Sequence, residues 1–200
     1  MKIMWRLAVC LLVLPLAGCA SLQVDRDLKH AELAQQYRSA VGPEASLAAA
    51  PQCTAATIGT TWTTLQFAPT TPVTKLPSGQ TAASFCIQIP AGARALELQA
   101  LGKGGMTFHE MIVVHPSLQF LDEKQSLIKN VAEPQLSAFD NLGGFGLRGV
   151  TVLTTDLSAA RSVIVYVHPD SLEGSLDVHT GYETIPVPYG PYGQVKVRFK

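Results

Sequence analysis

The chain has 200 residues, a formal net charge of zero, 15% charged residues and 47% hydrophobic residues. This length accommodates one folded domain with a substantial buried core. Neither the balanced charge nor any charge run suggests the basic surface that nucleic-acid binding requires, so we expect no nucleic acid among the partners.

The first residues have the pattern of an export signal. Lys2 and Arg6 make the start positive, and an apolar run follows from Leu7 to Leu16. The run is shorter than the roughly 20 apolar residues that span a bilayer, so residues 1–18 are predicted to be a signal peptide. The segment Leu16-Ala17-Gly18-Cys19 resembles the lipobox of bacterial lipoproteins, which implies cleavage before Cys19 and acylation of that residue, for example with palmitate.

This resemblance implies a membrane anchor at Cys19. Each buried acyl CH₂ contributes about 0.8 kcal/mol, and two or more chains hold a protein stably on a membrane. Ala20 follows the cysteine, whereas Asp at this position in such lipoproteins favours the inner membrane. We therefore expect the periplasmic face of the outer membrane. Removal of the signal leaves 13 basic and 15 acidic residues, a formal net charge of −2.

The remaining cysteines predict a disulfide. Cys10 lies in the signal and Cys19 is the lipidation residue, which leaves Cys53 and Cys86 as an even pair. In an oxidising compartment such a pair favours a disulfide. The alternatives are a metal site and a catalytic thiol, but the pair lacks the Cys-x-x-Cys spacing that zinc sites usually show.

Residues 19–51 are predicted to form a lipidated tether. Residues 24–41 have helical spacing of apolar and charged positions, and Gly42-Pro43 ends the predicted helix. Its apolar positions are Leu28, Ala31, Leu33, Ala34 and Tyr37. Residues 44–51 are Ala-rich and read as a linker. The helix is expected either to pack weakly on the following domain or to space it from the membrane.

Residues 52–200 are predicted to form an antiparallel β-sandwich of a jelly-roll-like kind. Residues 84–90 and 95–101 alternate apolar and polar positions around a Pro-Ala-Gly turn, the pattern of an antiparallel pair. Residues 162–168 are apolar nearly throughout, which predicts a strand buried on both faces. About eight short strands with turn residues between them favour a sandwich.

Two segments rich in glycine or proline, 132–149 and 184–193, are predicted to be loops. The second of them carries two tyrosines, with a third nearby. Tyrosines on a stiff loop offer apolar faces with hydroxyls at the rim, as sugar and partner surfaces often do. The predicted ligand-binding residues are Trp62, Tyr182, Tyr189 and Tyr192. The alternative is that the tyrosines cover an edge of the core.

No catalytic residue, metal site or cofactor is predicted. The chain has no Gly-x-Ser-x-Gly elbow, and residues 143–149 lack the Lys-Ser/Thr of a phosphate loop. On one predicted strand, 106–115, His109 and His115 fall about 20 Å apart, too far to share an ion. A metal site would need another histidine from a different strand, and the default is that strand-end histidines bond the backbone.

Residues 53–200 resemble the maltose-operon periplasmic protein family. The resemblance is carried by Cys53 with Trp62-Thr63-Thr64-Leu65, by Phe85 to Gly92 with Leu96-Glu97-Leu98, by Phe108 to Glu123, and by Tyr192-Gly193 with the final strand. The family is exported and similar in setting to maltodextrin-uptake components. It has no established catalytic residues, so the resemblance implies none here.

The expected function is a non-catalytic accessory or binding module at the outer membrane. It would hold a maltodextrin, another glycan or a porin, in maltodextrin or other glycan uptake. The alternative is a structural envelope protein that binds a protein partner or peptidoglycan, with no small ligand. Exposed aromatic faces on the tyrosine-containing segment 184–193 would favour the binding module over the structural protein.

Overall fold

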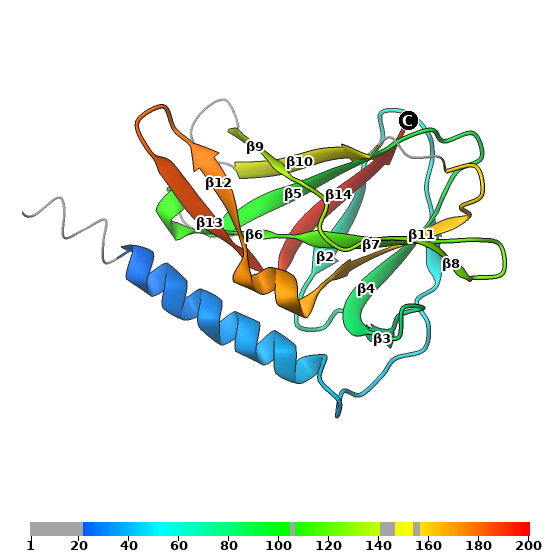
Figure 1. The fold of residues 1–200 in the computed structure, drawn as a ribbon, viewed down its shortest axis with the longest axis horizontal. Helices are drawn as coiled ribbons and strands as arrows, with labels where there is room; N and C mark the ends of the chain where they lie inside the picture. Colours follow the sequence, from blue (N-terminus) through cyan, green and yellow to red (C-terminus); the bar gives the residue numbers. More distant parts are fainter. Residues whose placement is uncertain (1–21, 105–106, 141–146, 154–156) are drawn as a thin grey trace, which may run out of the picture.

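The computed structural model describes residues 22–104, 107–140, 147–153 and 157–200. These residues form an N-terminal helix over 22–40 and two mixed sheets that pack as a sandwich (Figure 1). The predicted all-β sandwich with a short N-terminal helix is confirmed. The predicted signal peptide and Cys19 lie outside the described residues.

The first sheet has the strand order β1-β4-β11-β7-β8, and β3 pairs with β4. Its strands are β1 (Cys53–Ala55), β3 (Val73–Lys75), β4 (Thr81–Gln88), β7 (Pro116–Leu121), β8 (Leu127–Val131) and β11 (Ser162–Val167). Every residue of β7 and β11 is buried. The central place of β11 explains why residues 162–168 are apolar almost without interruption.

The second sheet has the strand order β12-β13-β6-β5-β10-β9, and β14 joins β2 to β5. Its strands are β2 (Thr63–Phe67), β5 (Leu96–Gly104), β6 (Met111–Val114), β9 (Ser137–Asp140), β10 (Leu147–Leu153), β12 (Ser175–His179), β13 (Thr184–Gly190) and β14 (Gly193–Phe199). Two short 3₁₀ helices, η1 (Phe108–Glu110) and η2 (Pro169–Glu173), lie between strands.

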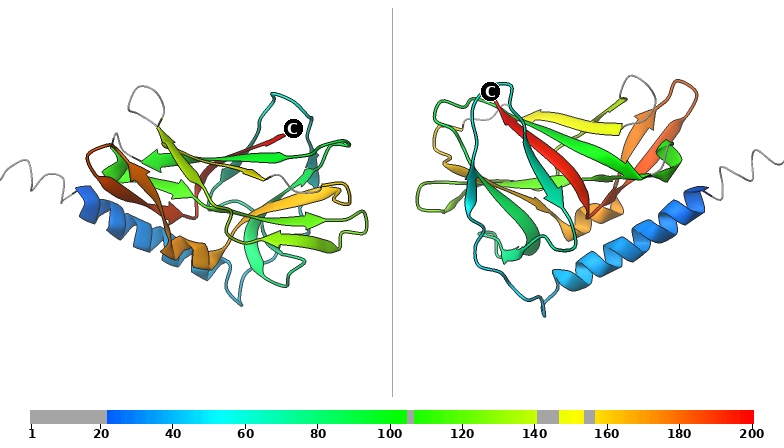
Figure 2. Two further views of the ribbon diagram at one scale, coloured as in Figure 1. Left: turned by 45° about the horizontal axis from the view of Figure 1, so that its top comes forward. Right: turned by 180° about the vertical axis from the view of Figure 1, so that it is seen from behind.

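The main core lies between the two sheets (Figure 2). Alternating strand residues point inward from both sheets, as period-2 side chains must when one face of each sheet is covered. Its large members include Phe67, Ile87, Leu96, Leu98, Phe120, Val165, Val197 and Phe199. Five of these, Ile87, Leu96, Leu98, Val197 and Phe199, come from the strands 84–90, 95–101 and 194–199 that alternation identifies.

Three predictions about strands need correction. The sheets are not purely antiparallel, because β1 pairs with β4 and β13 pairs with β6 in parallel. The segment 132–149 contains β9 and the start of β10 rather than only a loop. The predicted strand 106–115 is shorter, because His109 lies in η1 and the strand β6 covers only Met111–Val114.

The predicted loop 184–193 is also wrong, because most of it is the strand β13. Ile185 and Val187 are buried and alternate with Pro186 and Pro188. Proline has no N–H to donate, and strands accept it only where that donor is not needed. Both prolines fall at alternate positions of β13, and the carbonyl of Pro186 accepts a bond from Arg26 of the N-terminal helix.

The predicted disulfide between Cys53 and Cys86 is present. The two cysteines are direct neighbours in the parallel register of β1 and β4. All three residues of β1 are exposed, so this short edge strand gains little from burial. The covalent link to buried Cys86 therefore supplies much of what holds β1 in place.

We expect the Cys53→Ala/Cys86→Ala variant to lose about 3–4 kcal/mol of unfolding free energy, because the unfolded chain is no longer closed into a loop. Equilibrium urea unfolding of the oxidised chain and the variant measures the difference. Thiol titration of the unreduced, denatured domain is the control and should find no reactive cysteine. Two reactive thiols, or equal unfolding free energies, would contradict the disulfide's role.

Candidate functional site

The N-terminal helix is docked on the sandwich through Tyr37. This side chain is 1% exposed, and its hydroxyl donates to the Val167 carbonyl at 2.7 Å. The same oxygen accepts the Ala83 N–H at 3.2 Å, so one atom joins the helix to β11 and β4. Burial raises the pKa of Tyr37 well above its usual range, which keeps the hydroxyl protonated and able to donate.

The first half of the helix rests on the strand β13 through polar side chains. Arg26 is 6% exposed and donates from Nη1 to the Pro186 carbonyl at 3.2 Å. Nε2 of His30 donates to the Tyr189 carbonyl at 2.7 Å, since a carbonyl can only accept. These bonds satisfy backbone oxygens of β13 that face the helix. Figures 1 and 2 show the helix running beside β13 and η2.

The inward face of this helix agrees with the predicted one only in part, because Ala34 and Tyr37 are buried as predicted. Leu28, assigned to the apolar face, is 66% exposed, and Ala31 is exposed as well. The buried positions are Arg26, Ala34, Tyr37 and Val41. These positions recur at helical spacing, but the first of them is Arg26, which donates a hydrogen bond to β13. Apolar periodicity alone therefore misplaced Leu28 and Ala31. The helix of the predicted tether is packed on the domain over most of its length.

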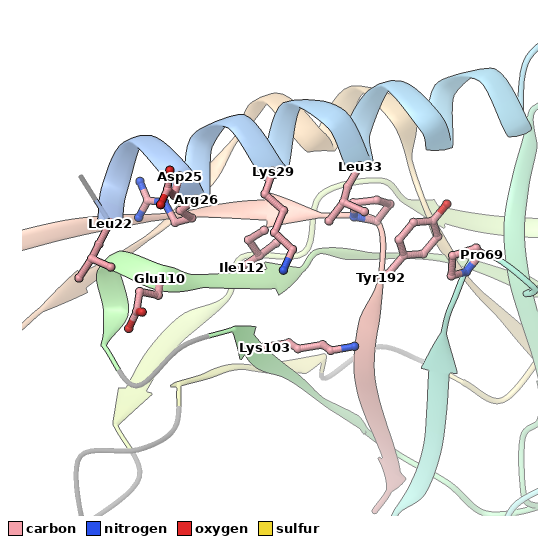
Figure 3. A pocket seen from close by; sticks show the side chains of 11 residues that line it. Leu22, Asp25, Arg26, Lys29, Leu33, Pro69, Lys103, Glu110, Ile112 and Tyr192 are labelled. Atoms are coloured by element: carbon pink, nitrogen blue, oxygen red, sulfur yellow. The ribbon is translucent and has the colours of Figure 1, made fainter. Parts of the chain in front are cut away.

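A groove of about 640 Å³ lies between the first half of the helix and the second sheet (Figure 3). Its apolar lining consists of Leu22, Leu33, Pro69, Ile112, Pro191 and Tyr192. Its charged lining consists of Asp25, Arg26, Lys29, Lys103 and Glu110. The groove thus joins an apolar surface to charged side chains from the helix, β5 and η1.

The charges of the groove are separated along its length. Asp25 and Glu110 lie toward the end where Leu22 is found, whereas Lys29 and Lys103 lie nearer the middle (Figure 3). Glu110 caps η1 by accepting from the N–H and the hydroxyl of Thr107, each at 3.1 Å. Arg26 is paired with Asp27 at 2.8 Å. The arrangement is suited to holding a ligand by shape and charge.

The four predicted ligand-binding residues do not gather at one place. Tyr192 lines the groove, with its ring edge-on to that of Tyr37 at 6.0 Å between centroids. Burial raises the pKa of Tyr192. Tyr182 is fully exposed in the turn between β12 and β13. Tyr189 lies at the end of β13, where its ring faces His115 at 4.3 Å.

Trp62 lies at the far end of the β2–β14 ladder from Tyr192. The register pairs Thr63 with Val197 at one end and Phe67 with Gly193 at the other. At about 3.3 Å per residue, the two aromatic residues are therefore on the order of 15–20 Å apart. They cannot form one stacking surface, and among the four only Tyr192 belongs to the groove.

Trp62 instead covers a cation of an ion-pair cluster. The Arg198 guanidinium lies 4.3 Å from the centroid of its ring and also pairs with Glu97. Nζ of Lys200 lies 2.7 Å from the same carboxylate. Burial acts to raise the pKa of Glu97, but the bonds from Lys200 and Arg198 outweigh it and lower this pKa. The cluster attaches the last strand to β5.

His115 lies in a second, smaller pocket beside Tyr189. It is 4% exposed, and Nε2 donates to the Pro134 carbonyl at 3.1 Å, so it bonds the backbone. Burial lowers the pKa of His115, which favours the neutral ring. Among the described residues, no three His, Cys, Asp or Glu side chains lie close enough to hold a metal ion.

The signals for the groove were weak in the sequence. Lys29 and Lys103 are 74 positions apart and belong to no motif. Ile112 belongs to a predicted strand but nothing marks it as a groove residue. Only Tyr192 was identified in advance, from its Pro- and Tyr-rich surroundings.

No helix in the described part of the chain has the length and apolar character needed to cross a membrane. Comparison with protein-family models, with curated proteins and with solved structures finds no match to this chain.

We expect Tyr37→Phe to lower the unfolding free energy by about 1–3 kcal/mol, because it leaves buried backbone groups of Val167 and Ala83 without the hydroxyl. Leu28→Ala is a matched control on the exposed side of the same helix and should change stability by less than about 0.5 kcal/mol. Urea unfolding measures both. Equal stabilities of the two variants would show that the Tyr37 hydroxyl does not hold the helix.

Proposed function

We propose that this chain is a non-catalytic binding module of the bacterial cell envelope, anchored through Cys19 to the periplasmic face of the outer membrane. The resemblance of residues 16–19 to a lipobox supports the anchor, and Ala20 supports the outer membrane. The Cys53–Cys86 disulfide supports an oxidising compartment.

The groove beside the N-terminal helix is the observation that carries the binding role. Its volume of about 640 Å³ lies within the range of about 300–1,000 Å³ typical of ligand sites. Its lining combines an apolar surface with a few charged side chains, which supports a binding role. The groove would bind a maltodextrin or another glycan during uptake, and the module could also hold a porin near the membrane. The family resemblance implies this setting.

A specific observation also favours a protein partner as a second candidate. Among the described strands, β8 pairs only with β7 and is an edge of the first sheet. Its side chains Leu127 and Ile128 are exposed. An edge strand with exposed apolar residues offers unpaired backbone groups to another chain. In this alternative the protein has a structural role in the envelope, with a protein or peptidoglycan partner and no small ligand.

We expect the full chain to be acylated at Cys19 and to fractionate with membranes, whereas Cys19→Ala carries no acyl chain and leaves the membrane fraction. Metabolic labelling with palmitate and fractionation on a density gradient measure both. Cys53→Ala is the matched control and should keep its label. A wild-type chain without label would contradict the anchor.

For the groove, we expect saturable binding of maltodextrins to residues 20–200, which contain every described residue. Affinity should weaken about tenfold in Tyr192→Ala, equivalent to about 1.4 kcal/mol, because an aromatic wall of the groove is removed. Tyr182→Ala is the matched control, since this tyrosine is exposed and outside the groove. Calorimetric titration with chains of increasing length measures the affinity.

Circular dichroism and thermal unfolding verify that both variants are folded. Absence of binding at millimolar sugar for every chain length would contradict a glycan ligand. Crosslinking in the envelope would then test the β8 edge for a protein partner.

A further inference from the structure

Two lysines approach the same part of the groove from different elements. Lys29 points from the helix toward Ile112, and the side chain of Lys103 runs from the end of β5 toward β14 (Figure 3). Within the described residues neither ammonium group takes part in an ion pair, whereas Arg26 beside them is paired with Asp27. The middle of the groove therefore carries two positive charges that no described residue pairs.

These charges favour an anion in the groove. Two like charges facing one opening repel each other. An acidic group between them would replace this repulsion with charge-assisted hydrogen bonds, which are roughly twice as strong as neutral ones. The carboxylates of Asp25 and Glu110 lie toward the Leu22 end, and Glu110 is engaged with Thr107. They leave the middle of the groove positive.

The surface around the lysines is apolar. Ile112 is buried in the floor, and Leu33 and Tyr192 continue the apolar wall away from the acidic end (Figure 3). Leu22 and Leu33 are eleven positions apart on the helix, which corresponds to about 16 Å at about 1.5 Å per residue. This geometry joins a cationic point to an extended apolar surface, as an amphiphile with an acidic headgroup requires.

The place of the groove in the chain points to the membrane as the source of such a ligand. Cys19 precedes Leu22 by three residues, and three residues reach at most about 10 Å. Leu22 lines one end of the groove. With Cys19 anchored, this end stands close to the lipid surface, where amphiphiles are concentrated and free inorganic anions are not.

We propose that the groove binds an anionic amphiphile from the membrane, with its acidic headgroup between Lys29 and Lys103 and its apolar chain over Ile112 toward Leu33 and Tyr192. This inference rests on the proposed function, because it names the ligand class of the same groove. It differs from the proposal of a neutral glycan in requiring the two lysines.

The test compares three probes that share one tail and differ in headgroup. Decyl phosphate, decyl maltoside and decyltrimethylammonium are titrated into residues 20–200 below their critical micelle concentrations. We expect decyl phosphate to bind at least tenfold more tightly than decyl maltoside, and the cationic probe to bind most weakly. Inorganic phosphate alone should not saturate the protein at millimolar concentration, because it lacks the apolar chain.

The variant Lys29→Gln/Lys103→Gln should lose the preference for decyl phosphate and keep its affinity for decyl maltoside. Both lysines are exposed, so the variant should fold like the parent. The matched control is Lys75→Gln/Lys124→Gln, which removes two exposed lysines outside the groove and should keep the preference. Acetylation footprinting locates the site, since decyl phosphate should protect Lys29 and Lys103 but not Lys75.

The outcomes separate this inference from the proposed function. Binding of maltodextrin or decyl maltoside without a preference for decyl phosphate overturns the anionic ligand and leaves the binding module standing. A preference that persists in the Lys29→Gln/Lys103→Gln variant overturns the assigned headgroup position. Equal binding of inorganic phosphate overturns the amphiphile. Failure of every probe and of every maltodextrin overturns both proposals.

Discussion

The buried hydroxyl of Tyr37 is the interaction on which the candidate site depends. It bonds backbone groups of β11 and β4, and so fixes on the sandwich a helix that lies outside both sheets. Arg26 and His30 add bonds to carbonyls of β13. The helix is one wall of the groove, and a helix that left the sandwich would remove Lys29 and Leu33 from it. A contact between helix and sheet thus creates one wall of the groove.

The same helix would connect ligand binding to the membrane. Its first described residue lines the groove, and the proposed lipid anchor is three residues earlier in the sequence. The proposed anchor would therefore hold the groove near the lipid surface, while the disulfide stabilises a separate edge of the first sheet. This separation of roles supports a module that presents one site to the membrane. A rigid sandwich positions the opposite wall, because β5 and β6 are paired strands.

Much of the fold was predictable because its signals are local. Alternation at residues 84–90 and 95–101 marked two strands of the core, and the cysteine pair indicated the disulfide. The predictions failed where a contact with a distant segment of the chain decides which way a side chain points or whether a segment forms a strand. Leu28 was predicted to face inward because apolar residues usually face the core, but it is exposed. The side of the helix that faces β13 instead carries Arg26 and His30, which donate to carbonyls of that strand. Residues 184–193 were read as a loop from their prolines, although a strand accepts prolines at positions that donate no bond.

The sequence by itself determined the sandwich class, the short helix and the disulfide pair, because each follows from a spacing within one segment or from a count of residues. Only the tertiary structure decided the site. Tyr192 was identified in advance, but it joins Lys29 from the helix and Lys103 from β5 instead of Trp62 and the other tyrosines. Strand register moved those aromatic residues apart, and helix docking brought the lysines together. Contacts between segments far apart in the sequence produce no periodic pattern of residues from which they could be predicted.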